Sequence, residues 1–174
     1  MPGPIAVPGG TARRVFRNRY ARPYAPALAT EEPTVARDEK IELLKRIPLF
    51  GSFDSHHLKR LGMLTEEVDV PAGKVLIRQG ELGDDLMVIY SGLVKVERDG
   101  VQVNKLGPGE FFGEIALLER GPRTATVTAE TPCRLLVINH REFHAMMEEF
   151  PEIAAKVLLT LAHRIRSLEP AAVQ

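Results

Sequence analysis

The residues best suited to chemistry lie together in one segment, Gly107 to Thr126. Gly113 lets the backbone approach a ligand closely, and the residues from Glu114 to Leu118 favour one or two turns of helix. The first turn of a helix has amide groups without partners inside the helix, and these amides attract an anion. Arg123 follows a Gly-Pro turn and adds a guanidinium that can bind two oxygens of the same anion. The segment therefore predicts a phosphate-binding site.

Two further polar residues narrow the kind of ligand. Thr124 adds a hydroxyl donor directly after Arg123. Glu114 is an acid next to a predicted anion site, which makes sense if its carboxylate accepts hydrogen bonds from sugar hydroxyls instead of facing the phosphate. Because a nucleotide carries both a phosphate and a sugar, the segment predicts a nucleotide ligand.

Short β-branched runs, separated by Gly, Pro and Asp, predict the strands that must hold this segment. They are Val68–Val70, Val75–Ile77, Leu86–Tyr90, Val94–Val96, Val101–Val103, Thr124–Thr128 and Leu135–Ile138. Asp99-Gly100 is a strong hairpin signal, because a primed turn needs positive φ angles that these residue types tolerate. Seven or eight strands at this spacing predict a closed antiparallel barrel or jelly roll.

Helical periodicity on both sides of the strands makes the predicted fold class α+β. Asp38 caps a first helix that Pro48 ends, a second helix follows a cap at Asp54 or Ser55, and Pro151 opens the last helix. Their inward faces are predicted to hold Leu43, Leu44 and Ile47, then Leu58, Leu61 and Leu64, and finally Ile153, Val157, Leu158, Leu161, Ile165 and Leu168. A further helical stripe, Phe143 to Phe150, precedes the last helix.

The two ends of the chain lack such periodicity. Residues 1–36 hold six prolines, and residues 1–30 carry five arginines and no acid. Such a segment buries too little apolar surface to offset the entropy of ordering, so a flexible tail is predicted, either a solvated extension or a contact for a partner or nucleic acid. Residues 37–169 form the predicted domain, and residues 170–174 a short C-terminal tail.

The composition excludes several classes of protein. The chain has 174 residues, is 44% hydrophobic and 26% charged, and has no net charge, which fits one globular domain. Its longest apolar run, Leu86–Tyr90, is far too short for a membrane span. The single cysteine, Cys133, cannot form an internal disulfide and reads as part of the core, which fits a cytoplasmic location.

The residues present do not predict catalysis. A metal-dependent barrel enzyme needs histidines on its strands, and none occurs between His57 and His140. The Gly-x-x-x-x-Gly-Lys-Ser/Thr loop of nucleotide hydrolases is missing, and we find no metal-binding cluster for a cyclase or phosphodiesterase. The sequence therefore predicts a binding module with no metal and no cofactor.

The segment Phe112–Leu118, followed by Pro122–Thr126, closely resembles the phosphate-binding cassette of cyclic nucleotide-binding domains. Such domains occur in cyclic nucleotide-gated channels, in cAMP- and cGMP-dependent kinases and in catabolite activator protein. The resemblance covers about residues 38–168, including Gly80–Asp84. It implies an eight-stranded antiparallel β-roll flanked by N-terminal and C-terminal helices, which binds cAMP or cGMP.

The resemblance also implies a role for each residue of the cassette. Glu114 would accept a hydrogen bond from the ribose 2′-hydroxyl, and Arg123 would neutralise the charge of the cyclic phosphate. The cradle would be completed by backbone amides around Gly113, Ile115 and Ala116 and by the hydroxyl of Thr124.

The base pocket of the family is apolar, and Val96 and Leu106 stand at matching positions. Arg164 falls where hyperpolarisation-activated channels have an arginine that contacts the purine. Asn104 departs from the hydrophobic residue expected at its position. Thr124 leaves the choice of ligand open, because cGMP-preferring kinases and channels that respond to both ligands carry threonine there. Apart from Thr124, we recognise no residue that would bind guanine specifically, and this favours cAMP over cGMP as the ligand.

The implied mechanism is a shift in population that makes the last helix, residues 151–168, a lid over the purine. Leu117 or Leu118 would repack in this shift and signal to a protein partner whose identity stays open. Six residues after Leu168 are too few for a DNA-binding helix-turn-helix, so no DNA-binding domain is predicted. The alternative is a structural or interaction module whose nucleotide pocket is vestigial.

Overall fold

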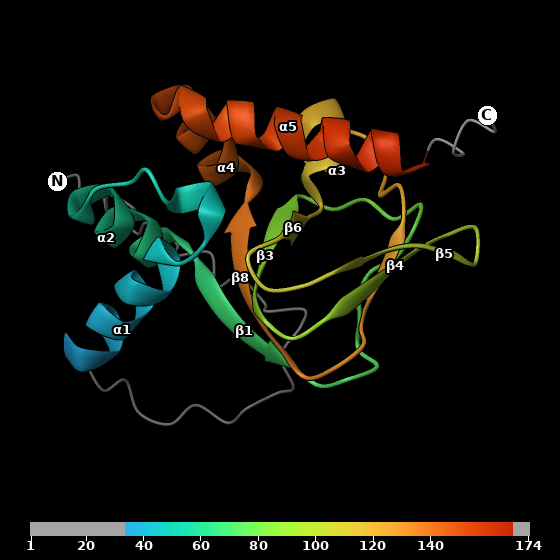
Figure 1. Cartoon of the computed structure of the whole chain (residues 1–174), viewed down its shortest axis with the longest axis horizontal. Helices are drawn as coiled ribbons and strands as arrows, with labels where there is room; N and C mark the ends of the chain where they lie inside the picture. The colour runs from blue at the N-terminus through green and yellow to red at the C-terminus, as the bar shows by residue number, and fades with distance from the viewer. Residues whose placement is uncertain (1–33, 169–174) are drawn as a thin grey trace, which may run out of the picture.

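The computed structural model describes residues 34–168, in which eight antiparallel strands form two four-stranded sheets (Figure 1). The strands are β1 (Glu66–Val70), β2 (Val75–Ile77), β3 (Asp85–Ser91), β4 (Val94–Arg98), β5 (Val101–Leu106), β6 (Phe111–Phe112), β7 (Thr126–Ala129) and β8 (Cys133–Asn139). One sheet has the order β1-β8-β3-β6 and the other β2-β7-β4-β5. The α+β class and the eight-stranded roll are confirmed.

The strand pairing corrects two details of the prediction. The pairs found among the described residues make two separate sheets and do not close into a barrel, because β2 and β6 are too short to bridge from one sheet to the other. Strand β6 was not predicted, since its two phenylalanines lie inside the cassette. Strand β7 begins at Thr126, so Thr124 lies in the loop before the strand.

The hairpin between β4 and β5 is confirmed. Asp99 and Gly100 have φ angles of 53° and 78°, and Arg98 pairs with Val101 across the turn. Gln79 fixes this turn from outside the hairpin, because its side chain exchanges two hydrogen bonds of 2.8 and 2.9 Å with Asp99. The tip of the hairpin is therefore held in place by the preceding loop.

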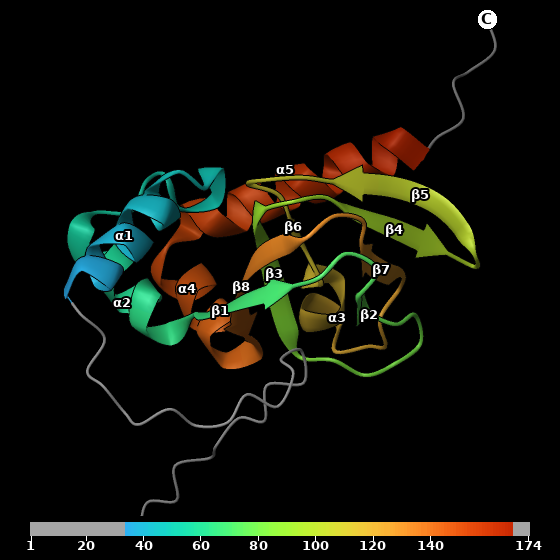
Figure 2. The ribbon, with the colours of Figure 1, turned by 90° about the horizontal axis from the view of Figure 1, so that it is seen from below.

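Helices gather around one end of the strands. They are α1 (Thr34–Lys45), the 3-10 turn η1 (Pro48–Phe50), α2 (Ser55–Leu64), α3 (Glu114–Glu119), α4 (His140–Glu149) and α5 (Pro151–Leu168). In Figure 2, α1, α2 and α4 lie at the left beside β1 and β8, and the sheet with β4 and β5 lies at the right. Within residues 34–168, every helix is too short or too polar to cross a lipid bilayer.

Two helix boundaries can be compared with the prediction. Helix α1 begins at Thr34, so the predicted start at Asp38 is wrong: Ala36 and Arg37 favour helix and extend it beyond Asp38 toward the N-terminus. The Asp54 cap of α2 is confirmed, with Oδ1 accepting the amide of His57 at 2.9 Å. The first 33 residues of the predicted tail (residues 1–36) and residues 170–174 lie outside the described residues, whereas the last three residues of that predicted tail belong to α1.

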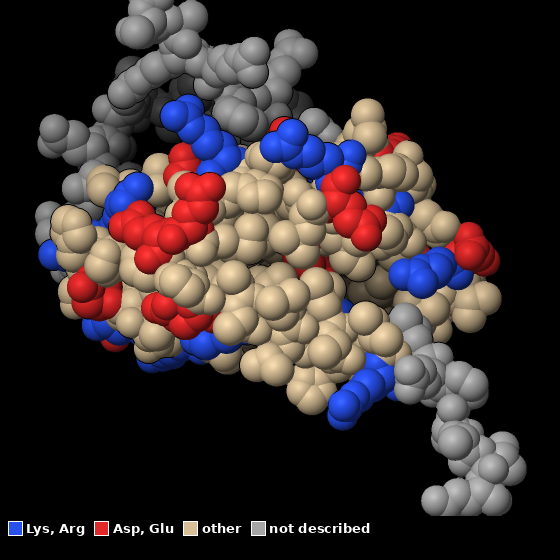
Figure 3. Space-filling view, turned by 90° about the horizontal axis from the view of Figure 1, so that it is seen from above, with Lys and Arg blue, Asp and Glu red and all other residues tan. Residues whose placement is uncertain are grey.

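Three predicted core positions face solvent instead. Leu64 is 37% exposed, because steps of three residues rotate it about 120° away from Leu58 around α2. On α5, Ile153 and Val157 are buried, but Leu158 and Ile165 are 65% and 61% exposed, since only a narrow stripe of this helix meets the core. Figure 3 shows the face of the molecule above α5, where uncharged side chains dominate.

The core consists of two clusters of buried side chains. One packs the helices against the sheet of β1, β8, β3 and β6 around Phe50 and Phe143, and it includes Leu117 of α3. The other lies between the two sheets and includes Cys133, whose predicted burial is confirmed. Burial raises the pKa of the Cys133 thiol. Helix α3 is therefore anchored to the helical cluster while its first turn faces the second sheet.

Candidate functional site

A cavity of about 440 Å³ lies between the β4–β5 hairpin, α3 and α5. All nine residues that the sequence assigns to the ligand line it, namely Val96, Leu106, Gly113, Glu114, Ile115, Ala116, Arg123, Thr124 and Arg164. The structure therefore brings the predicted phosphate, ribose and base residues into one place. Their roles toward a ligand stay predictions.

The first turn of α3 forms one wall of the cavity. Gly113 precedes it with a φ of 93°, a left-handed conformation that residues with a Cβ rarely adopt. A Cβ at Gly113 would also lie 2.8 Å from the Asp85 carbonyl oxygen and 2.8 Å from Arg123 Nη1. Because the N-cap has no side chain, the first-turn amides of the helix keep the character of an anion-binding wall.

Arg123 is held firmly beside this turn. Its side chain is buried, with 5% of the residue exposed, and its guanidinium donates to the carbonyl oxygens of Gly113 and Asp85 at 2.8 and 2.9 Å. Its backbone pairs with the loop before β3, through the carbonyl oxygen of Glu81 and the amide of Gly80, at 2.8 Å each. A cation therefore stands at the end of α3 where the partial positive charge of the helix is located.

Gly83 lies against Arg123 and was not among the residues predicted for the site. A Cβ at this position would lie 2.4 Å from Arg123 Nε and 2.6 Å from its Nη2. The glycine therefore makes room for the guanidinium. Gly83 belongs to the stretch Gly80–Asp84 that the resemblance includes, but its approach to Arg123 is seen only in the structure.

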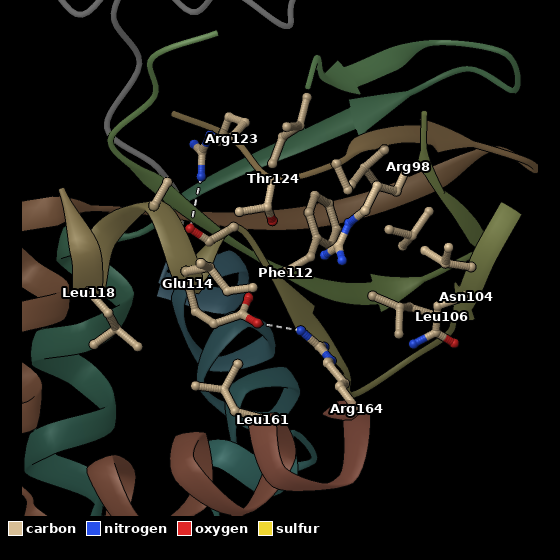
Figure 4. Close-up of a pocket in the computed structure, with 18 of the residues that line it drawn as sticks. Arg98, Asn104, Leu106, Phe112, Glu114, Leu118, Arg123, Thr124, Leu161 and Arg164 are labelled. Atoms are coloured by element: carbon tan, nitrogen blue, oxygen red, sulfur yellow. Dashed lines mark hydrogen bonds and ion pairs between the residues drawn. The ribbon is translucent and has the colours of Figure 1, made fainter. Parts of the chain in front are cut away.

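Glu114 and Arg164 pair with each other across the cavity (Figure 4). The Glu114 carboxylate is almost fully buried, and its Oε1 lies 2.5 Å from Arg164 Nη1. Arg164 also donates to the carbonyl oxygen of Phe111, and its guanidinium carbon lies 5.3 Å from the centre of the Phe111 ring. The residues predicted to contact ribose and purine thus bind one another in this structure, which ties α5 to α3.

The opposite end of the cavity is partly polar. Val96 and Asn104 face each other in the β4–β5 register, and Leu106 and Phe112 supply apolar walls. Arg98 also lines the cavity, and sequence reasoning missed it. The sequence does indicate this position, because alternate residues of a strand share a face and Arg98 stands two residues after Val96.

The residues around the cavity suit three chemically different groups. The first turn of α3 and Arg123 suit an anion, the Glu114 carboxylate suits a hydroxyl donor, and the side chains between the hairpin and α5 suit a flat, largely apolar group. Within residues 34–168, no three His, Cys, Asp or Glu side chains lie close enough together to hold a metal ion.

Comparison with known proteins identifies the family. Residues 67–150 match the family model described as the cyclic nucleotide-binding domain. Residues 67–150 therefore form a cyclic nucleotide-binding domain. The matched residues run from β1 to the end of α4 and include the whole cassette, so the resemblance seen in the sequence is confirmed.

Relatives of this cyclic nucleotide-binding domain belong to different larger proteins. The chain is 36% identical over 120 residues to a cAMP-dependent protein kinase regulatory subunit of Yarrowia lipolytica, covering 69% of this chain and 29% of that protein. It is 40% identical over 111 residues to the human potassium/sodium hyperpolarization-activated cyclic nucleotide-gated channel 4, covering 63% of this chain and 9% of the channel. The chain therefore spans less than a third of these two relatives.

A solved structure has a similar fold. The regulatory domain of Toxoplasma gondii PKA, in a co-crystal structure with cAMP, superposes with a TM-score of 0.57 at 33% identity. The match covers 66% of this chain and 46% of that chain.

Proposed function

We propose that this domain binds a cyclic purine nucleotide, cAMP or cGMP, and works as a regulatory sensor without catalysis. The observation that carries the proposal is the cavity itself, which joins a buried arginine at the start of α3, a buried carboxylate and apolar walls. These three parts match the cyclic phosphate, the ribose and the base. The similar domain of Toxoplasma gondii PKA, crystallised with cAMP, supports the proposal.

Titration calorimetry on the purified chain tests the proposal directly. We expect saturable binding of one cyclic nucleotide per chain, with 5′-AMP and 5′-GMP as linear controls that carry the same bases and sugar. The linear phosphates bring an additional charge and more bulk to the Arg123 wall, so they should bind more weakly. An absence of binding for both cyclic nucleotides would instead favour the alternative, a structural module with a vestigial pocket.

The proposed output runs through the helices. Leu117 is fully buried in the helical cluster with α4 and α5 residues, whereas Leu118 is 39% exposed and lines the cavity. A ligand that moves α3 therefore acts on α4 and α5 through Leu117. In this proposal the shifted helices contact a protein partner in the cytoplasm, and the ligand changes the population of that arrangement.

The ribose 2′-hydroxyl and the Arg164 guanidinium would compete for the Glu114 carboxylate. A 2′-hydroxyl that reaches Glu114 must share or replace the Arg164 guanidinium, so the net gain is that of an ordinary hydrogen bond. We expect Glu114→Ala to weaken cAMP or cGMP binding by about 0.5 to 1.5 kcal/mol, and 2′-deoxy ligand to lose little further affinity on this variant. Calorimetry on the two proteins with the two ligands measures this coupling. Fully additive losses would contradict the ribose contact.

Thr124 is expected to distinguish the two bases. It lines the cavity beside Arg123, where its hydroxyl can serve a phosphate oxygen of either ligand, or the 2-amino group of a guanine in the syn conformation. Because adenine lacks that group, Thr124→Ala should weaken cGMP about threefold to tenfold more than cAMP. Equal losses for the two ligands would leave Thr124 as a phosphate contact only.

A further inference from the structure

Arg98 has a place in the cavity that follows from the alternation of β4. Val94, Val96 and Arg98 are two residues apart and share one face of the strand, and Val96 and Arg98 line the cavity. Lys95 and Glu97 share the other face and form an ion pair with each other at 3.2 Å. Figure 4 shows the Arg98 side chain reaching into the cavity, toward Phe112.

The acids next to Arg98 in sequence have other partners. Glu97 pairs with Lys95, and the carboxylate of Asp99 accepts a hydrogen bond from Gln79 at 2.8 Å. Across residues 34–168, the structure records no hydrogen bond or ion pair of the Arg98 guanidinium. The hairpin thus fixes the backbone of Arg98 and presents its donors to whatever enters the cavity.

Asn104 adds a second donor on the neighbouring strand. It stands opposite Val96 in the register and lines the same cavity. Its Oδ1 accepts the backbone amide of Lys105 at 2.8 Å, which orients the side-chain amide. The Nδ2 amino group is then the part of this side chain that is available to donate to a ligand.

We propose that the side chains of Arg98 and Asn104 donate hydrogen bonds to the edge of a 6-oxopurine, and that guanine is therefore the preferred base. This inference rests on the proposed function. Guanine presents two neighbouring acceptors, O6 and N7, which suit the fork of an arginine, whereas adenine places an amino donor at the position of O6. Two donors facing an adenine amino group gain nothing from it. The expectation of cAMP from the sequence is thereby reversed, because it rested on finding no guanine reader.

Three cyclic nucleotides separate this contact from others in the cavity. Cyclic IMP carries O6 and N7 but lacks the 2-amino group that Thr124 would contact, so its affinity reports on the 6-oxo edge alone. We expect the parent chain to bind cGMP and cyclic IMP at least about fivefold more tightly than cAMP. A bidentate arginine–guanine contact discriminates between bases by roughly 5- to 150-fold, and an exposed arginine falls at the lower end.

The decisive comparison is the variant Arg98→Ala, titrated with the same three ligands. It should lose about five- to tenfold in affinity for cGMP and for cyclic IMP and stay within twofold for cAMP. Asn104→Leu should lose affinity for the same two ligands. Lys95→Ala is the matched control, because it removes a positive charge from the outer face of the same strand, and it should leave all three affinities unchanged.

The outcomes are distinct. Equal losses for all three ligands in Arg98→Ala would overturn the inference, since they would indicate a general attraction between the guanidinium and the phosphate. Equal affinities of the parent chain for the three ligands would overturn it as well. If none of the three bound at all, the proposed function itself would fail together with the inference.

Discussion

Replacing Arg123 with alanine is expected to weaken cyclic nucleotide binding by about 2 to 5 kcal/mol, on the order of 30-fold to several thousand-fold. The guanidinium is buried beside the start of α3, so its pairing with an anion takes place away from bulk water. The carbonyl oxygens of Gly113 and Asp85 accept hydrogen bonds from Arg123. Without the guanidinium, the cyclic phosphate would face these two oxygens. Calorimetric titration with cAMP and cGMP measures the loss.

Two companion variants make this result interpretable. Arg134→Ala removes an arginine whose side chain pairs with Asp69 on the exposed surface, and its ligand affinity should match the parent. Arg123→Lys keeps the cation but removes the planar fork, so an intermediate loss is expected. Thermal melting of each variant shows whether it is folded. Binding of either cyclic nucleotide within threefold of the parent by a folded Arg123→Ala protein would show that the phosphate assignment is wrong.

A methyl group at Gly83 is expected to weaken binding almost as strongly, although this residue carries no side chain to contact the ligand. The new Cβ would lie 2.4 Å from Arg123 Nε, so the guanidinium must move away from its present place. Losing the alignment of one charge-assisted contact removes about 1.5 to 3 kcal/mol, or roughly 10- to 150-fold in affinity. The clash falls on a side chain and on no backbone atom, so we expect the fold to survive, with a melting temperature lowered by the loss of the Arg123 hydrogen bonds to Gly113 and Asp85.

Gly121 supplies the matched control for Gly83. It lies in the loop between α3 and Arg123, and a Cβ there would meet open space. Gly121→Ala should therefore bind cyclic nucleotide as the parent does. If Gly83→Ala and Gly121→Ala bound equally well, Gly83 would have no part in placing Arg123.

The Glu114–Arg164 pair ties the cassette to the last helix. It links α3 to α5 at the position where the resemblance predicts the ribose and the purine. In the proposed function, a ligand that draws Glu114 to its ribose would release Arg164 for the base, so one binding event would change both ends of this link. The lid predicted for residues 151–168 is therefore already in contact with the cassette.

Features that depend on a few neighbouring residues could be read from the sequence. The Asp99-Gly100 turn and the Asp54 cap are confirmed, because each reflects the conformational preferences of one or two residues. The cassette belongs to this group, since its glycine, helix turn and arginine lie within one short segment. For this reason the sequence alone indicates the family and six of the residues that line the cavity, Gly113, Glu114, Ile115, Ala116, Arg123 and Thr124, whereas Val96, Leu106 and Arg164 follow from the resemblance.

Other features exist only where distant parts of the chain meet. Gly83 and Arg123 are 40 positions apart in sequence, and Glu114 and Arg164 are separated by 50. No local preference of any of these residues points to its partner, because the contact depends on the path of the strands and helices between them. The exposure of Leu158 was decided in the same way, since helical periodicity defines a face of α5 but only packing decides how wide a stripe is covered. The sequence by itself thus determined the phosphate-binding segment, and the tertiary structure determined that Gly83 meets Arg123 and that Arg98 joins the wall of the cavity.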